Sequence, residues 1–407
     1  FEAGYLDAAI TAYQQATRAD TSDARAWARL ARIQTYSSSL TTTDRQRRTR
    51  LEEAMASIDQ AIALAPEDSE VRAIRAFVLD WNASAIVDSN ERQAMLIDAE
   101  LEASQALQFD NQNVLALAFY AEILVDQQKW DQAEDIILQA LARDPSLMDV
   151  HRVYAYVLEA TGRYRQAIEE YQRAIEINPN LTFLHLSVGY NYRSLAFEST
   201  IESQRRELYN LALEYFDRAA SLNEQLGIQD PLPYIAIAKT YSQQGEFFIA
   251  SQNILAALAF DPTNPELYAQ LGIIYRSARN FEGSIPALQC ALRGCDPETS
   301  CLARFGDVCE GDEGVTVEGM PLSPGTADYY LAYGSTLAAL SRPQQNYCDE
   351  AISVLNELMA GYGSDPIIAS NVEISLQICA SLAQSMREAT PIPPPTPLPP
   401  PPPPPQN

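Results

Sequence analysis

Residues 129–145 read KWDQAEDIILQALARDP, and residues 163–179 read RYRQAIEEYQRAIEINP. The second stretch begins 34 residues after the first and repeats its pattern. An aromatic residue, two alanines and a closing proline agree, at Trp130 and Tyr164, Ala133 and Ala167, Ala140 and Ala174, and Pro145 and Pro179. Apolar residues spaced by three and four predict a helix with one buried face, and the proline predicts where that helix stops.

The same helix pattern recurs near 5–16, 247–262 and 281–291, and a second kind of helix precedes most copies. Its clearest example places Tyr268, Leu271, Gly272 and Tyr275 on one face. A small residue between large ones allows two helices to approach closely. This alternation of two helix types resembles the tetratricopeptide repeat family. The resemblance implies an all-α, right-handed α-solenoid of helix hairpins.

The resemblance covers residues 1–387, which we expect to form one solenoid, and leaves 388–407 as a proline-rich tail. We expect a lone second-type helix near 5–19 and a lone first-type helix near 366–387. Eight helix pairs lie between them, near 23–65, 68–109, 112–143, 147–177, 181–222, 230–260, 264–293 and 326–361. Insertions at 37–46, 82–91, 196–205 and 341–347 are predicted to lengthen loops, and a larger insertion at 294–325 contains cysteines.

The composition argues against several classes of function. There are 54 acidic and 28 basic residues and a net charge of −26, which disfavours nucleic acid and anionic membrane surfaces as partners. No continuous apolar run reaches the roughly 18–20 residues that a membrane span needs, so we expect no span. The two histidines, His151 and His185, occupy equivalent repeat positions and are predicted to be packing residues. We therefore expect no enzyme, no catalytic residues, no cofactor and no metal.

All six cysteines lie in the last third of the chain: Cys290, Cys295, Cys301, Cys309, Cys348 and Cys379. Disulfides, reduced buried thiols and a zinc cluster are the alternatives, but the spacings do not match paired zinc knuckles. We expect disulfides, with Cys348 bonded to Cys379 and the other four stapling the insertion to the preceding helix. Disulfides indicate an extracellular or cell-surface location, or the periplasm. The chain begins at Phe1 without a signal-peptide pattern, so we expect a processed form or a fragment.

Two surface features remain open at this stage. Asp307, Glu310, Asp312 and Glu313 could hold Ca²⁺ on a glycine-containing loop, although their spacing is not that of an EF-hand and acidic loops are usually only solvated. Glycans are possible covalent partners. Asn82, in a predicted inserted loop, and Asn180 begin N-glycosylation sequons, and Thr390 and Thr396 lie among prolines suited to O-glycosylation.

The tail at 391–407 contains 12 prolines among 17 residues. Such a segment favours a polyproline II helix, which would extend about 50 Å at roughly 3.1 Å per residue. A stiff, solvated linker is the usual interpretation of such a segment, but we expect this one to dock on an aromatic-lined groove. The tyrosine-rich concave face of the same or a neighbouring copy is the candidate.

The two lone helices predict self-assembly. Each would expose an apolar face, and together they would complete a composite repeat between two copies. We expect the interface to include Tyr5, Ile10, Tyr13, Ile368, Ile374 and Ile378. A contact between different surfaces that does not close produces a filament. The alternatives are a monomeric scaffold that binds a peptide or protein in its concave groove, and a regulatory subunit of an enzyme or secretion complex.

Overall fold

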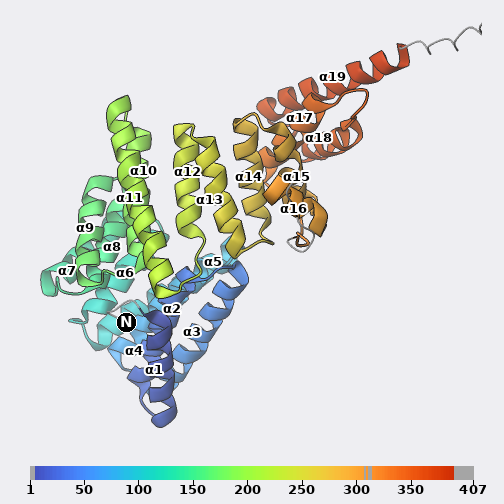
Figure 1. Cartoon of the computed structure of the whole chain (residues 1–407). Helices are drawn as coiled ribbons and strands as arrows, with labels where there is room; N and C mark the ends of the chain where they lie inside the picture. The colour runs from blue at the N-terminus through green and yellow to red at the C-terminus, as the bar shows by residue number, and fades with distance from the viewer. Residues whose placement is uncertain (1–4, 307–308, 310–313, 389–407) are drawn as a thin grey trace, which may run out of the picture. The chain divides into compact units, whose positions relative to one another are not determined.

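The computed structural model describes residues 5–306, 309 and 314–388. The chain divides into two compact units, Phe1–Pro262 (unit 1) and Thr263–Asn407 (unit 2). The described residues contain 19 α-helices and no β-strand (Figure 1). This confirms the all-α solenoid fold. Whether the two units form one continuous array stays a prediction, and the proline-rich tail lies outside the described residues.

Unit 1 is built of a single helix followed by six helix hairpins. Its helices are α1 (Leu6–Ala19), α2 (Ala24–Ser37), α3 (Asp44–Leu64), α4 (Ser69–Ala83), α5 (Ser89–Phe109), α6 (Val114–Asp126), α7 (Trp130–Arg143), α8 (Met148–Ala160), α9 (Tyr164–Ile177), α10 (Thr182–Glu198), α11 (Glu202–Leu226), α12 (Leu232–Gln244) and α13 (Phe247–Phe260). A 3₁₀ turn (Ser38–Leu40) joins α2 to α3. The even-numbered helices are first-type helices and the odd-numbered ones are second-type helices.

Unit 2 contains two hairpins, a short inserted helix and a final helix. They are α14 (Pro265–Ser277), α15 (Phe281–Leu292), α16 (Pro297–Phe305), α17 (Ala327–Leu340), α18 (Cys348–Tyr362) and α19 (Pro366–Glu388). Helix α16 lies in the cysteine-containing insertion, where the sequence analysis expected no helix.

The insertions in unit 1 lengthen helices more than loops, which corrects the prediction. Helices α3 and α5 each have 21 residues and α11 has 25, whereas α7, α9 and α13 each have 14. The extra turns form because the inserted residues supply good start signals. Thr43 forms a reciprocal capping box with Gln46, and the Asp88 side chain accepts from the amides of Asn90 and Glu91.

Small residues at the hairpin contacts hold the two helices of a pair together. A Cβ added to Gly189 of α10 would lie 2.3 Å from the buried ring of Phe216 on α11. Gly272 of α14 faces Leu288 in the same way, at 2.5 Å. The small position in the repeat pattern is therefore a steric requirement of helix pairing.

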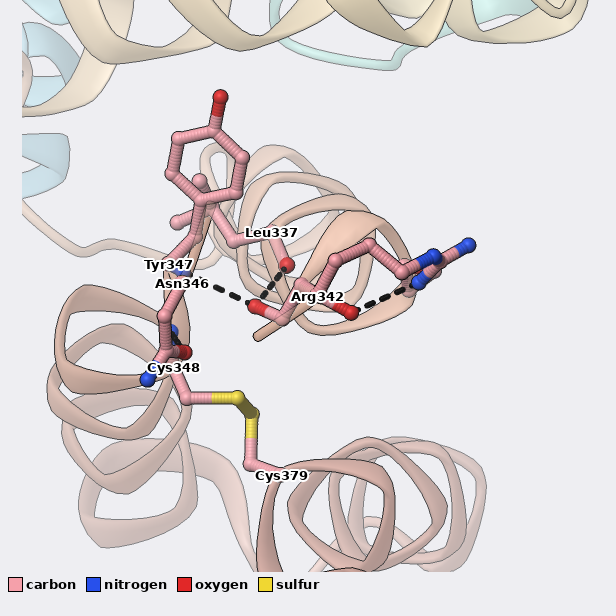
Figure 2. The surroundings of a disulfide bond; sticks show 8 residues. Leu337, Arg342, Asn346, Tyr347, Cys348 and Cys379 are labelled. Atoms are coloured by element: carbon pink, nitrogen blue, oxygen red, sulfur yellow. Dashed lines mark hydrogen bonds between the residues drawn. A yellow bond between two sulfur atoms is a disulfide. The ribbon is translucent and has the colours of Figure 1, made fainter. Parts of the chain in front are cut away.

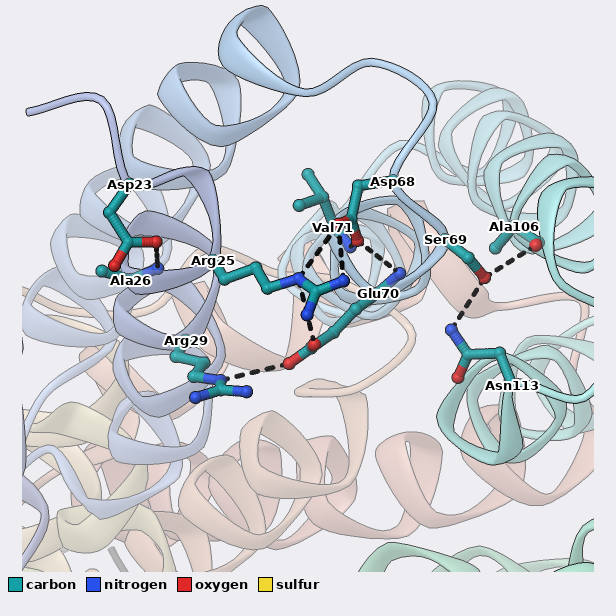
Figure 3. Close-up of polar contacts among 10 residues, drawn as sticks. All are labelled: Asp23, Arg25, Ala26, Arg29, Asp68, Ser69, Glu70, Val71, Ala106 and Asn113. Carbon is teal, nitrogen blue, oxygen red and sulfur yellow. Dashed lines mark hydrogen bonds and ion pairs between the residues drawn. The ribbon is translucent and has the colours of Figure 1, made fainter.

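Polar side chains connect the ends of adjacent hairpins in unit 1, as Figure 3 shows. Asp68 caps α4 and also accepts from Arg25 of α2 at 3.0 Å. Arg29, one turn later, pairs with Glu70 at 3.1 Å. Ser69 donates to the carbonyl of Ala106, which ties α4 to α5. These contacts fix each helix start against its neighbour, so the capping residues also set the stacking of the repeats.

Candidate functional site

A disulfide joins α18 to α19 in unit 2, the pairing that we expected (Figure 2). Cys348 is the first residue of α18 and Cys379 lies in α19, with their Cα atoms 5.5 Å apart and both side chains buried. The start of α18 is held in place by two polar contacts. Asn346 accepts from the amide of Cys348, and the Ser341 hydroxyl accepts from the amide of Tyr347. The bond therefore fixes α19 to a well-anchored helix start.

The other four cysteines form Cys290–Cys295 and Cys301–Cys309. The first bond links the end of α15 to the insertion, and Cys295 also exchanges both backbone hydrogen bonds with Val317 at 3.0 Å. The second bond lies within the insertion. The Cys290–Cys295 bond therefore agrees with the predicted staple to α15, whereas Cys301–Cys309 does not reach α15 and corrects that part of the prediction. The candidate calcium ligands Asp307, Glu310, Asp312 and Glu313 lie outside the described residues.

The two histidines perform equivalent structural tasks one repeat apart. The Nε2 atom of His151 lies 2.8 Å from the carbonyl oxygen of Pro145, and that of His185 lies 2.9 Å from the carbonyl oxygen of Pro179. Both rings are buried. A hydrogen bond to Glu170 raises the pKa of His151, whereas burial lowers the pKa of His185. Each histidine thus ties the start of a first-type helix to the preceding turn.

The inner face of unit 1 is occupied by its own side chains. Arg32 and Tyr36 of α2 both bond to Asp149 of α8, more than 110 residues away in sequence. Tyr36 also stacks on Phe183 of α10, with ring centroids 5.7 Å apart and the planes 6° from parallel. Tyr36 is 0% exposed. Helices α2, α8 and α10 therefore meet in a core at these side chains.

A second part of this core is an ion pair between an arginine and a glutamate, with two buried aspartates beside it. Arg152 of α8 donates two hydrogen bonds to Glu122 of α6, at 2.7 and 2.6 Å. Close by, Tyr156 donates to Asp126 at 2.6 Å. Burial raises the pKa of Asp126 to about 6 and raises the pKa of Asp80 well above its usual range. The charge of Asp126 adds to the rise at Asp80, whereas a hydrogen bond with Asp80 lowers the pKa of Asp126. These groups are joined to one another across α6 and α8, so the arrangement holds the first-type helices together.

The sequence analysis did not find this network, because its contacts join repeats that are far apart along the chain. One signal was present. Asp149 and Arg152 place two charges within the first-type helix α8, amid residues that otherwise pack. Buried charges of this kind require partners.

The predicted assembly residues divide into exposed and buried positions. Tyr5, Ile374 and Ile378 are 55%, 56% and 41% exposed. Tyr13 and Ile368 are half-buried. Ile10 is only 6% exposed, because it packs in the core with Leu6 and Ala9 of α1, and it is therefore unavailable to a second copy. This last placement corrects the expectation.

The predicted glycosylation positions differ from their expected settings. Asn82 lies in the last turn of α4, where its amide donates to the carbonyl of Val78, and so it is not in an inserted loop. Asn180 lies in the turn before α10, and Thr182 of its sequon is 0% exposed. Thr390 and Thr396 lie outside the described residues. Glycosylation stays a prediction.

The sequence predicted no membrane span, but helix α19 meets the length and composition criteria for one. By length and composition alone, Pro366–Arg387 could cross a membrane, with 22% of its most apolar stretch buried. The sequence analysis missed it because its apolar residues are interspersed with serine, asparagine and glutamine, so no continuous run exists. The disulfide to Cys348 and the packing against α17 and α18 show it as part of the folded unit.

Comparison with known proteins identifies the repeat. Residues 121–181 match the tetratricopeptide repeat family. The chain is 33% identical over 78 residues to the Vi polysaccharide export protein VexE of Salmonella typhi, a match that covers 18% of this chain and 12% of that protein.

Solved structures with a similar arrangement share little sequence. The Cut9 and Hcn1 hetero-tetramer of APC/C matches with a TM-score of 0.51 and 16% identity, over 81% of this chain and 53% of that one. Human IFIT1, solved as a dimer with PPP-AAAA, matches with a TM-score of 0.50 and 15% identity, over 85% and 72%. The chain thus spans about half the length of the first of these structures. Residues 121–181 therefore match the tetratricopeptide repeat family, and the all-α solenoid fold of the chain is similar to that of these solved structures.

Proposed function

We propose that this chain is a non-enzymatic protein-interaction scaffold that associates with copies of itself, head to tail, through α19 of one copy and α1 of the next. The observation that carries the proposal is a pair of helices with faces left uncovered by the described residues. The three disulfides support an extracellular or cell-surface setting.

On α19, the uncovered face is apolar. Ile367, Ile374 and Ile378 are 73%, 56% and 41% exposed, and their spacing of seven and four places them on one side of the helix. The buried face lies elsewhere on α19 and includes Val372 and Cys379, which are 0% and 2% exposed. Helix α19 packs on α17 and α18 through that buried face. A row of exposed isoleucines beside a covered face is typical of a surface that binds another protein.

On α1, the uncovered face is the one that second-type helices normally present to their hairpin partner. In α7 and α13 the equivalent side chains are 0% exposed, at Ala133, Ile137 and Ala140, and at Ala250, Ile254 and Ala257. In α1 the corresponding Ala9 is 8% exposed and packs in the core, whereas Tyr13 is half-buried and Ala16 is exposed, so the uncovered part of this face is its second half. This small-residue face suits close approach of a first-type helix, which is the role that α19 could supply.

Charge favours the same pairing. Residues 1–80 carry ten arginines and twelve acids, whereas residues 281–407 carry four arginines and fifteen acids. Arg45 and Arg48 of α3 are exposed near this end of unit 1. Both regions are net negative, so the attraction would come from these arginines meeting acids of the next copy, and added salt would weaken that local attraction.

At Arg32, Tyr36 and Asp149 the inner face of unit 1 is filled by its own side chains, which disfavours a peptide at that point of a concave groove. A second candidate function is that of a subunit of a secretion complex. The similarity to the Vi polysaccharide export protein favours it, and that similarity is confined to 78 residues.

The test uses the intact chain at low ionic strength, examined by electron microscopy and by light scattering after size exclusion. We expect long assemblies, and we expect Ile374→Asp to leave folded monomers. The control Ala380→Asp places the same charge on another exposed face of α19 and should assemble normally. Equal assembly by both variants, or monomers from the unmodified chain, would contradict self-association. Monomers that capture a different protein would favour the secretion-complex candidate.

A further inference from the structure

A surface groove lies in unit 1 where the end of α10, the start of α11 and the end of α12 come together. Its volume is about 570 Å³, which is within the usual range for ligand-binding pockets. Two aromatic residues, Phe197 and Tyr209, line it together with Arg205, Arg206, Gln243 and Gln244. This groove is separate from the exposed faces of α1 and α19.

The aromatic part of the groove is unusually accessible. Phe197, in the last turn of α10, is 78% exposed, and the nearby Ile201 between α10 and α11 is 58% exposed. Tyr209 of α11 is only 6% exposed and forms a fixed wall. An exposed phenylalanine beside a buried aromatic wall offers a surface for a flat apolar ring.

The polar part of the groove offers a hydrogen-bond donor that has no acceptor. The Nε2 atom of Gln244, a lining residue, is buried and has no partner among the described residues. An unsatisfied buried donor is costly, and an acceptor from a ligand in the groove would satisfy it.

These features match one segment of this chain in particular. A proline residue has a carbonyl acceptor and no amide donor, and residues 391–407 contain 12 prolines and no charged side chain. In a polyproline II helix all carbonyls are free and the rings can stack on aromatic side chains. The segment therefore supplies acceptors and apolar rings where the groove supplies donors and aromatic walls. An acidic ligand fits less well, because Glu202 and Glu246 also line the groove.

We propose that this groove binds the proline-rich tail, residues 391–407, of a second copy of the chain. The contact is independent of the pairing between α19 and α1, so it can hold whether or not that pairing does. It would give each copy a second connection to a neighbour and would raise the local concentration of the end-to-end contact.

The first test measures binding of a fluorescent peptide with the sequence of residues 391–407 to the full chain by anisotropy. We expect Phe197→Ala and Gln244→Ala each to weaken binding about five- to tenfold, the range for loss of one anchoring side chain. The control Val87→Ala removes a side chain that is 91% exposed elsewhere in unit 1 and should change nothing. Because the tail is uncharged, raising the salt from 50 to 500 mM should have little effect.

The second test uses the full chain with p-benzoylphenylalanine in place of Phe197, and irradiation of a mixture of ¹⁵N-labelled and unlabelled copies. We expect cross-linked pairs in which the probe is joined to the 391–407 segment of the other isotopic species. Cross-links confined to single copies would overturn the assignment to a second copy. Peptide binding that is unaffected by Phe197→Ala, or that is replaced by strong, salt-sensitive binding of an acidic peptide, would overturn the proposal as a whole.

Discussion

At the scale of single residues, the buried acids of unit 1 predict how stability changes with pH. Burial raises the pKa of Asp126 from 3.8 to about 6, so the folded chain holds this proton to a higher pH than the unfolded chain does. The free energy of unfolding therefore falls as pH rises between those two values, by on the order of 1–3 kcal/mol from this group. Four neighbouring groups modify this pKa: the charge of Glu122 raises it further, whereas Tyr156, Asp80 and Arg152 lower it.

Asp126→Asn tests this account, because an amide keeps a neutral side chain at every pH. Compared with the unmodified chain, the variant should lose less stability between pH 4 and pH 7 in denaturant titrations. Tyr156 can still donate to the amide oxygen, so the fold should be retained. Identical pH dependence in the two proteins would show that Asp126 is not a buried, protonated acid.

At the scale of helices and hairpins, the stabilisation supplied by the disulfide between α18 and α19 can be tested. The bond closes a separation of 31 residues, for which loop entropy predicts about 3–4 kcal/mol of stabilisation. Replacing Cys348 and Cys379 by serine should lower the unfolding temperature of unit 2 and expose α19 to proteases. Replacing Cys290 and Cys295, which are separated by 5 residues, should cost only about 2 kcal/mol. A smaller loss from the first pair than from the second would contradict this ranking.

Hairpin packing makes a second prediction at this scale. Gly189→Ala would place a methyl group against the buried ring of Phe216 and should destabilise the chain by about 1–3 kcal/mol. Gly361→Ala in α18 meets only a side-chain atom of Leu322, at 3.2 Å, and adds helix propensity. We expect that variant to be neutral or slightly stabilised. Chemical denaturation of both variants checks the contrast.

At the scale of the whole chain, the sequence predicted the features that depend on residues close together in the chain. The 34-residue spacing, the small residues at hairpin contacts and the capping signals are set within one or two repeats, so they predicted the helices from Trp130 to Ile177 well. The inner core was missed because Tyr36 meets Asp149 only after four hairpins have stacked. Ile10 was misplaced for a related reason. An apolar residue on α1 looks the same in sequence whether it faces α2 or a second copy.

The most direct measurement of the central claim mixes two variants that each disable one end. Ala16→Asp blocks the exposed face of α1, and Ile374→Asp blocks the exposed face of α19. Each variant alone should remain monomeric, because each retains only one working surface. Mixed in equal amounts, they retain one compatible pair of surfaces, and sedimentation or mass photometry should detect a 1:1 dimer that grows no further. Gln15→Asp, on another side of α1, should assemble like the unmodified chain. Monomers alone in the mixture, or assemblies longer than dimers, would contradict head-to-tail association through α19 and α1.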